Sequence, residues 1–182
     1  MDNRYKAWAA RWRVPLGFVA GIVYLVVSRP TWICLIVGEI IALAGLAMRG
    51  LAAGHLEKNL KLATSGPYAL CRNPLYLGSF LLAVGFAVAG CYLPLGIALV
   101  ALFLVIYLPV MHREEAFLRQ KFGAEYENYV ARTPLFLPKI GGMTAGAFKF
   151  SWEGYRKNRE YEAALGFVII SLILIVKIVL GA

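Results

Sequence analysis

Charged residues, histidine and cysteine are all scarce in this sequence, and each shortage excludes a class of protein or of site. Only 16% of the 182 residues are charged, which is below the range of an ordinary soluble domain. The two histidines, His55 and His112, have no further histidine or cysteine at ligand spacing, so we expect no dedicated metal site. The three cysteines, Cys34, Cys71 and Cys91, are an odd number, and we expect no disulfide framework.

Hydrophobic residues, in contrast, make up 60% of the chain, and the mean hydropathy is +0.68. No Ser- or Gly-rich linker and no shift in composition marks a second domain, so residues 1–182 are expected to form a single integral-membrane domain. Long apolar runs bounded by charge predict about five transmembrane helices and an all-α fold. These runs are Val14–Val27, Thr31–Met48, Leu75–Ala89, Leu93–Met111 and Ala163–Leu180.

The basic residues fall almost entirely on one predicted side of the membrane. Of the 19 Lys and Arg residues, only Arg29 and Lys177 lie outside the N-terminal stretch and the two long polar segments. The positive-inside rule therefore predicts that the N-terminus and both long polar segments lie in the cytoplasm and the C-terminus outside. We expect the membrane to be a bacterial inner membrane. The net charge of +9 suggests contact with anionic lipid headgroups rather than nucleic acid, and no obligate protein partner is evident.

The first apolar run follows a basic stretch, a pattern that also occurs in signal peptides. We expect a retained helix, because no small-x-small cleavage pattern follows the run. Gly17 and Gly21, four residues apart, predict a face for close helix packing.

The polar stretch GPYALCRNPLYLG, residues Gly66–Gly78, interrupts the apolar pattern just before the third run. Each proline favours a helix start, and Asn73 followed by Pro74 reads as the N-cap and first residue of a membrane helix. Helix N-termini attract anions, Arg72 adds a guanidinium suited to a carboxylate or phosphate, and Gly78 is expected to leave room for a ligand. The alternative is a plain polar connection in which the tyrosines and Arg72 anchor the chain at the membrane interface.

A second polar stretch, HREEAFLRQKFGAEYENYVARTPLFLP, follows the fourth apolar run at residues 112–138. Glu114 and Glu115 are expected at the C-terminal end of that helix, where negative charge opposes the helix dipole and needs compensation. Pairing of Glu115 with Arg119 one turn later is one possibility, and Gly123 is expected to break or bend the helix. The alternative is an interfacial amphipathic helix with solvated ion pairs.

Together the two stretches resemble the integral-membrane methyltransferases of the isoprenylcysteine carboxyl methyltransferase and phospholipid methyltransferase group. The resemblance covers residues 64–138 and departs at Asn73, where the family commonly has a histidine; an amide does not titrate near neutral pH. The matching residues are Gly66, Pro67, Tyr68, Arg72, Pro74, Tyr76, Gly78, Glu114, Glu115, Phe122, Gly123, Tyr126, Tyr129 and Pro138.

The resemblance implies an S-adenosyl-L-methionine-dependent transfer of a methyl group to a lipophilic, membrane-embedded carboxylate or amine at the cytoplasmic face. The cofactor-binding residues that it implies are Tyr68, Arg72, Asn73, Pro74, Tyr76, Gly78, Glu114 and Glu115. Arg72 to Gly78 would hold the amino-acid end of the cofactor, the two acids its ribose or ammonium, and the two tyrosines its sulfonium or adenine. We expect Glu115 also to position the acceptor or take its proton, and Arg132 to meet an anionic substrate group.

Two other functions remain open from the sequence alone. Membrane sterol-reductase-like enzymes, which use a nicotinamide cofactor, share a similar proline–tyrosine entry motif, but they have an Arg-Asp pattern where this chain has Arg113, Glu114 and Glu115. A non-catalytic lipid-binding protein fits the hydropathy and leaves the motifs unexplained. Glu39, in the middle of the second run, is a further functional candidate, and the C-terminal extension, residues 139–182, has no counterpart in the family motif.

Overall fold

The computed structural model describes residues 3–56, 61–139 and 150–181, and every regular element in these ranges is a helix. The helices are α1 (Asn3–Val27), α2 (Trp32–His55), α3 (Pro67–Leu70), α4 (Pro74–Ala89), α5 (Leu93–Phe122), α6 (Ala124–Val130), α7 (Trp152–Lys157) and α8 (Tyr161–Leu180). All five predicted apolar runs are therefore helical. By length and hydropathy, α2, α5 and α8 are long enough to cross a membrane, while the apolar parts of α1 and α4 are shorter. The fold is that of a polytopic helical membrane protein, as the sequence predicted.

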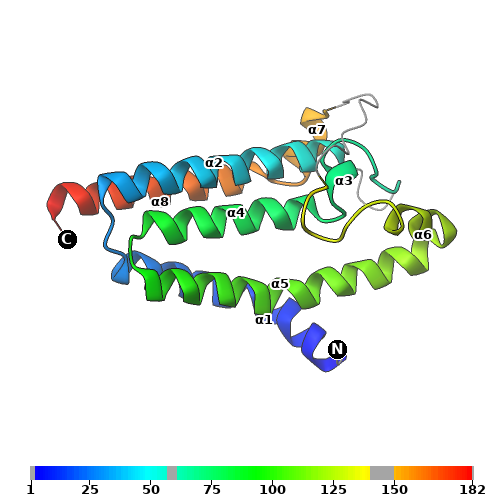
Figure 1. The fold of residues 1–182 in the computed structure, drawn as a ribbon, viewed down its shortest axis with the longest axis horizontal. Coiled ribbons are helices and arrows are strands. Elements are labelled where there is room, and N and C mark those ends of the chain that lie inside the picture. The colour runs from blue at the N-terminus through cyan, green and yellow to red at the C-terminus, as the bar shows by residue number, and fades with distance from the viewer. Residues whose placement is uncertain (1–2, 57–60, 140–149, 182) are drawn as a thin grey trace.

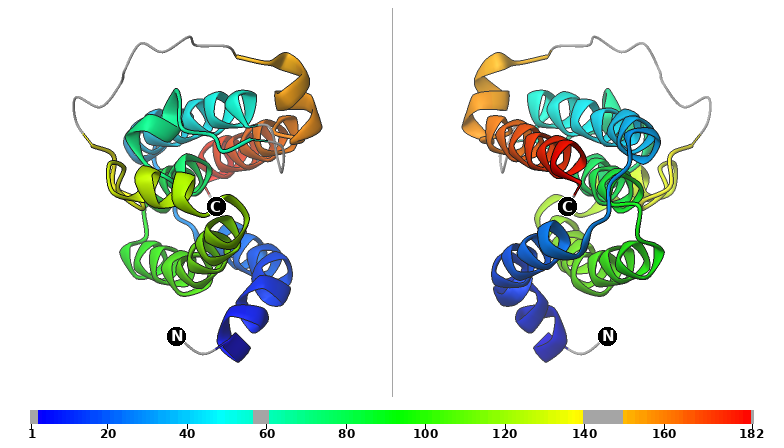
Figure 2. Two further views of the ribbon diagram at one scale, coloured as in Figure 1. Left: turned by 90° about the vertical axis from the view of Figure 1, so that its right-hand side faces the viewer. Right: turned by 90° about the vertical axis from the view of Figure 1, so that its left-hand side faces the viewer.

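The five long helices run along one common direction, except for the first turns of α1, which turn away from the bundle, and the short helices gather at one end (Figure 1). That end holds α3, α6, α7 and the start of α1, while the opposite end holds the C-terminus and the connections α1–α2 and α4–α5. Seen end-on, α4 lies between α2 and α8 on one side and α1 and α5 on the other (Figure 2). The basic residues Lys58 and Lys149, which contributed to the predicted orientation, lie outside the described residues.

The outer faces of the long helices are apolar and exposed. Phe18, Ile33 and Ile40 are 72%, 78% and 63% exposed, far more than a soluble protein leaves uncovered along a whole helix face. These side chains contact lipid when the bundle spans a bilayer.

The closest helix packing in the bundle is that of α2 against α4, and small residues make it possible. A Cβ atom added to Gly38 would lie 2.4 Å from the carbonyl oxygen of Gly85, and one added to Gly78 would lie 2.6 Å from the carbonyl oxygen of Gly45. The two backbones therefore touch, as in other membrane helix pairs with small residues at the interface. This corrects the expectation that Gly78 leaves room for a ligand, because α2 fills the space beside it.

The predicted packing face of α1 is also wrong in this structure. Cβ atoms added to Gly17 or Gly21 would meet nothing within 4 Å. Within the described residues the small-residue pattern that packs lies on α2 and α4, not on α1.

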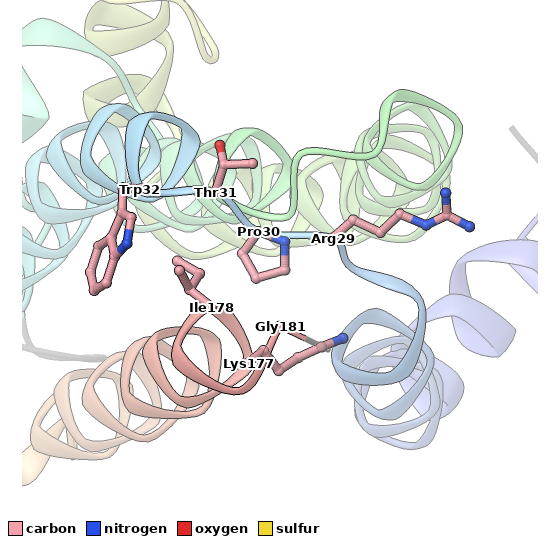
Figure 3. Close-up of a pocket in the computed structure, with 7 residues that line it drawn as sticks. All are labelled: Arg29, Pro30, Thr31, Trp32, Lys177, Ile178 and Gly181. Atoms are coloured by element: carbon pink, nitrogen blue, oxygen red, sulfur yellow. The ribbon is translucent and has the colours of Figure 1, made fainter.

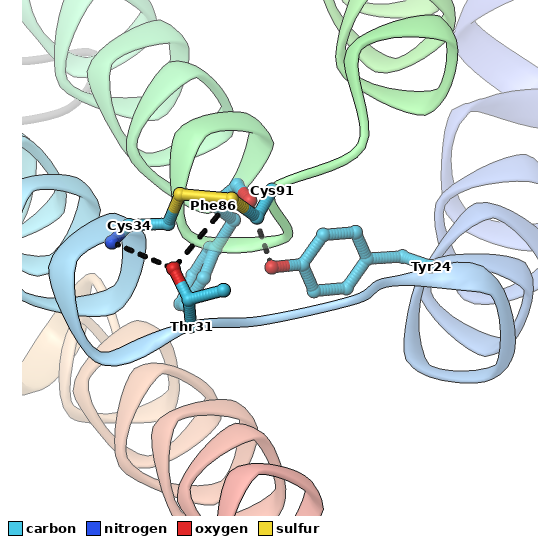
Figure 4. The surroundings of a disulfide bond; sticks show 5 residues. All are labelled: Tyr24, Thr31, Cys34, Phe86 and Cys91. Carbon is cyan, nitrogen blue, oxygen red and sulfur yellow. Dashed lines mark hydrogen bonds between the residues drawn. A yellow bond between two sulfur atoms is a disulfide. The ribbon is translucent and has the colours of Figure 1, made fainter. Parts of the chain in front are cut away.

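The expectation that no disulfide holds the fold is overturned by a bond between Cys34 and Cys91 (Figure 4). Cys34 lies in the first turn of α2 and Cys91 in the turn between α4 and α5, with Cα atoms 5.7 Å apart. The odd count of cysteines was a poor guide, because the third thiol, Cys71, is free and buried. It directly follows α3, which lies at the other end of the bundle. The disulfide joins the start of α2 to the α4–α5 turn, at the end of the bundle that holds the C-terminus.

Lysine 177 also stabilises this end of the bundle. Its Nζ atom donates hydrogen bonds from α8 to the carbonyl oxygens of Leu25 and Ser28, at 2.9 and 2.7 Å. The last carbonyl groups of α1 have no partner within the helix, so this ammonium caps α1 from outside.

Candidate active site

Two prolines shape the turn that leads into α4. Pro67 and Pro74 are the first residues of α3 and α4, as predicted, and Gly66 before α3 has φ = 59°, a conformation that favours glycine. Asn73 is the N-cap residue of α4, but its side chain does not cap the helix. Its Nδ2 atom instead donates to the carbonyl oxygen of Leu135 at 3.1 Å.

The segment after α6 lies along this turn and closes it from one side. The backbone N–H of Arg72 donates to the carbonyl oxygen of Pro134 at 2.9 Å, and that of Lys139 donates to the carbonyl oxygen of Leu70 at 3.0 Å. With the Asn73 side chain, these contacts make a short strap over the entrance to α4. The two polar stretches of the sequence are therefore in direct contact.

An ion pair between Arg72 and Glu115 joins the stretches at their centre. Arg72 Nη1 lies 2.9 Å from Glu115 Oε1, and the side chains are only 11% and 13% exposed. The same oxygen accepts a hydrogen bond from the hydroxyl of Tyr126 at 3.3 Å, and Oε2 lies 3.5 Å from His112 Nδ1. The predicted pairing of Glu115 with Arg119 is wrong, because Arg119 lies 3.5 Å from the exposed carboxylate of Glu127 instead.

The guanidinium of Arg72 retains hydrogen-bonding capacity. Its Nε and Nη1 atoms are buried and make no hydrogen bond within the described structure, so the contact of Nη1 with Glu115 is an ion pair without an aligned N–H. A buried donor without an acceptor is costly, whereas an anionic ligand that accepts from it removes that cost. The residues present therefore fit the carboxylate of an amino-acid-like cofactor.

The second acid, Glu114, contacts α4 directly. Its Oε1 atom accepts a 2.7 Å hydrogen bond from the hydroxyl of Tyr76. The ring of Tyr76 packs against Tyr107, with centroids 5.6 Å apart, and Tyr107 stacks on Phe103 at 4.4 Å. The rings of Tyr76, Tyr107 and Phe103 thus form a continuous row of aromatic contacts that begins beside Glu114 and extends along α5 into the apolar part of the bundle.

Both acids lie within α5 rather than at its end, which corrects the sequence-based placement. The helix continues to Phe122 and spans 30 residues, about 45 Å at 1.5 Å per residue. That is longer than the roughly 30 Å of a hydrocarbon core, so the last turns extend beyond it. The predicted break or bend at Gly123 is confirmed as a break, because this residue, with φ = 51°, separates α5 from α6.

Three buried phenols, those of Tyr68, Tyr126 and Tyr129, belong to the same end of the bundle as the ion pair. Tyr129 donates a 2.6 Å hydrogen bond to the backbone carbonyl of Tyr68, whose side chain is also buried. Burial raises the pKa of Tyr68 and of Tyr129, and burial together with the charge of Glu115 raises the pKa of Tyr126 to about 12. All three phenols are therefore neutral donors at physiological pH.

Two predicted residues lie away from this cluster. Arg132 lies on the exposed turn after α6, so the structure does not bring it into the buried site. Glu39 lies within α2, and its Oε1 atom is buried without a hydrogen-bond partner in the described part of the chain. Sequence reasoning also missed His112, which borders Glu115 and was noted only as one of two histidines.

A hollow of about 360 Å³ lies at the opposite end of the bundle (Figure 3). The side chain of Lys177 turns from it toward the end of α1, where it is already hydrogen-bonded. Nothing in the hollow resembles the acid and base pairs around Arg72, so we do not take it as the active site. It is lined by Arg29, Pro30, Thr31, Trp32, Lys177, Ile178 and Gly181. In the described ranges no three His, Cys, Asp or Glu residues are grouped so as to hold a metal ion.

Comparison with known proteins gives the chain several relatives. A "Cobalt-zinc-cadmium resistance protein CzcN" of Cupriavidus metallidurans is 32% identical over 139 residues, which are 71% of this chain and 62% of that protein. A "Probable protein-S-isoprenylcysteine O-methyltransferase" of Oryza sativa subsp. indica is 38% identical over 125 residues, 64% of each chain. The protein-S-isoprenylcysteine O-methyltransferase of Rattus norvegicus is 32% identical over 116 residues, 61% of this chain and 41% of that one.

The chain spans less than two thirds of the length of these relatives. No solved structure matches it. The sequence profile of the phospholipid methyltransferases matches residues 33–125, about half of the chain, from α2 into α6. This stretch contains Arg72, Tyr76, Glu114 and Glu115, the charged and phenolic groups that meet in the structure. The chain therefore belongs to the phospholipid methyltransferase family.

Proposed function

We propose that this protein transfers a methyl group from S-adenosyl-L-methionine to a lipophilic acceptor held in the membrane. The observation that carries the proposal is the meeting of Arg72 and Tyr76, from the α4 entrance, with Glu115 and Glu114, from α5. The site thus offers a positive and a negative side chain in one place. S-adenosyl-L-methionine requires both, because it carries an anionic carboxylate together with a cationic ammonium and a cationic sulfonium group. Membership of the family and the names of the plant and mammalian relatives support the same reaction type.

The residues around Arg72 suit the cofactor's amino-acid end. Arg72 donates from Nε and Nη1 to the carboxylate, and the positive end of the α4 dipole adds to the attraction. Glu114 and Glu115 accept from the ammonium or from ribose hydroxyls, and Tyr76 with Tyr68 lies beside the cationic sulfur or the adenine. When bound, the cofactor supplies a methyl group that leaves a sulfonium sulfur for an acceptor oxygen or nitrogen.

The protein's contribution to the chemistry is positioning and a dry environment. The strap at Pro134 and Leu135 and the buried phenols limit water around Glu115, which strengthens electrostatic interactions there. With an amine acceptor, Glu115 takes the proton that the nitrogen loses; a carboxylate acceptor needs no base. The acceptor reaches the site from the lipid, along the apolar helix faces, and the soluble cofactor enters from the polar end.

We further propose that this polar end faces the cytoplasm. Most of the basic residues lie in the segments at this end, and the positive-inside rule places such segments in the cytoplasm. The disulfide between Cys34 and Cys91 supports the same orientation, because it lies at the other end and disulfides persist in oxidising compartments, whereas the free Cys71 lies at the site.

Methyl labelling of membranes tests the function. Membranes that contain the protein are incubated with methyl-labelled S-adenosylmethionine, and lipid and protein fractions are extracted separately. We expect label in one of these fractions. The variant Glu115→Gln should abolish labelling of an amine acceptor, which needs the base, and should reduce labelling of a carboxylate acceptor through weaker cofactor binding. Absence of label and of binding by S-adenosylmethionine or S-adenosylhomocysteine would overturn the proposal; binding of a reduced nicotinamide instead would indicate a reductase.

A further inference from the structure

The C-terminal segment, described from residue 150 onward, is attached to the C-terminal end of α2. The backbone N–H of Ser151 donates to the carbonyl oxygen of Gly54, and Asn158 Nδ2 donates to that of Ala53, both at 3.0 Å. The Phe150 ring also covers Gly54, where an added Cβ would lie 2.4 Å from the ring. The last carbonyl groups of α2 are therefore satisfied by α7 and its flanks, which lie beyond the 33–125 match.

Glu160, in the same segment, forms a buried ion pair with Arg49 on α2. Its two carboxylate oxygens accept from Arg49 Nε and Nη2, both at 2.9 Å, and Glu160 is only 5% exposed. The remaining Nη1 of Arg49 donates to the hydroxyl of Ser79 on α4. One guanidinium thus ties α2 and α4 to the residue that precedes α8, in the two-pronged geometry that is strongest for arginine and carboxylate.

This cluster adjoins the candidate active site. A Cβ atom added to Gly78 would lie 2.6 Å from Arg49 Cγ, so the arginine stem lies against α4 one turn after Pro74. Ser79 is one turn after Tyr76 on the same helix, and its hydroxyl also donates to the carbonyl oxygen of Leu75 at 2.9 Å. The cluster therefore contacts the turn of α4 that carries Tyr76.

The buried phenol of Tyr68 senses both acid clusters. Burial is the main cause that raises its pKa, and the charges of Glu114, of Cys71 and of Glu160 raise it further. The phenol of Tyr68 is therefore within electrostatic reach of both carboxylates. Glu160 forms part of the surroundings of the site although it comes from the C-terminal extension.

We propose that the Arg49–Glu160 pair is a positioning unit that completes the cofactor site from the C-terminal extension. By holding Arg49 against Ser79, Glu160 fixes the first turns of α4 and with them Arg72 and Tyr76. The inference rests on the proposed function, because its readout is the affinity for S-adenosylmethionine.

The test compares Glu160→Gln and Ser79→Ala with wild type in the membrane labelling assay, at varied concentrations of S-adenosylmethionine. Glu160→Gln removes the charge without loss of size, and Ser79→Ala cuts the link to α4 while the ion pair stays intact. The control is Glu162→Gln, since Glu162 is an exposed acid on the same segment that pairs with Arg159. We expect KM to rise roughly tenfold for Glu160→Gln and about threefold for Ser79→Ala, in the range of measured couplings through intermediate residues.

The rate at saturation separates positioning from mere stability. A residue that only stabilises the fold lowers the saturating rate through a smaller active fraction and leaves KM unchanged. Unchanged KM in both variants, with an active wild type, overturns the inference and leaves the proposed function intact. If Glu160→Gln does not fold, Ser79→Ala decides alone. A wild type that neither labels membranes nor binds the cofactor overturns both proposals.

Discussion

Replacement of Arg72 by alanine is the most informative single perturbation of the proposed site. The side chain is only 11% exposed and its Nε and Nη1 atoms are buried donors without an acceptor. A hydrogen bond to a charged group contributes about 1.5–3 kcal/mol, so two such bonds to a cofactor carboxylate contribute at least about 3 kcal/mol. Since about 1.4 kcal/mol corresponds to tenfold in affinity, Arg72→Ala should weaken cofactor binding on the order of 100-fold.

The loss of Arg72 also leaves Glu115 without its main partner, and breaking a buried pair costs up to about 3–5 kcal/mol of stability. A second variant, Arg72→Gln with Glu115→Gln, removes both charges and avoids this penalty. The matched control is Arg113→Ala, which removes an exposed arginine two residues before Glu115. Binding of S-adenosylhomocysteine is measured by calorimetry in detergent, with folding checked by circular dichroism and gel filtration.

We expect the single and the double variant to bind weakly and the Arg113→Ala control to bind like wild type. If both site variants fold and bind within about threefold of wild type, the reasoning that Arg72 holds the cofactor carboxylate is refuted, since a loss of about 0.7 kcal/mol is less than that of even one hydrogen bond to a charged group.

Three further predictions concern packing and cysteine chemistry. Gly38→Leu should lower the free energy of unfolding by at least about 2 kcal/mol, since its Cβ would lie 2.4 Å from the Gly85 carbonyl; an unchanged midpoint in denaturant titration would contradict the close helix contact. Burial raises the pKa of the Cys71 thiol to about 11, so alkylation should be slow at pH 8 and gain speed only toward pH 11, and fast labelling at pH 8 would contradict that burial. Cys34→Ser should abolish a reductant-dependent change in gel mobility that wild type shows, whereas a wild type without such a change would contradict the bond to Cys91.

Local sequence signals were enough for the helices and for the entrance to α4. Hydropathy located all five apolar helices, and the two prolines located the starts of α3 and α4. The apolar run alone ends at Met111, but residues Arg113 to Phe122, which are polar and include many good helix formers, continue α5 to the predicted break at Gly123.

Contacts between distant parts of the chain could be predicted only where a family motif pointed to them. The family motif predicted that Arg72 and Glu115 belong to one site, and in the structure Arg72 Nη1 lies 2.9 Å from Glu115 Oε1. No such motif linked Arg49 to Glu160, 111 residues away, and the pair remained invisible in the sequence. The bond from Cys34 to Cys91 was missed for the same reason, since pairing depends on which helix ends meet.

Photo-crosslinking of methyl-labelled S-adenosylmethionine to the purified protein, followed by peptide mapping, tests the central claim most directly. The account predicts label in peptides from residues 66–78 and 112–129, reduced by excess S-adenosylhomocysteine and absent in Arg72→Ala. Label confined to the hollow near Arg29 and Lys177, or label that excess S-adenosylhomocysteine does not reduce, would contradict it.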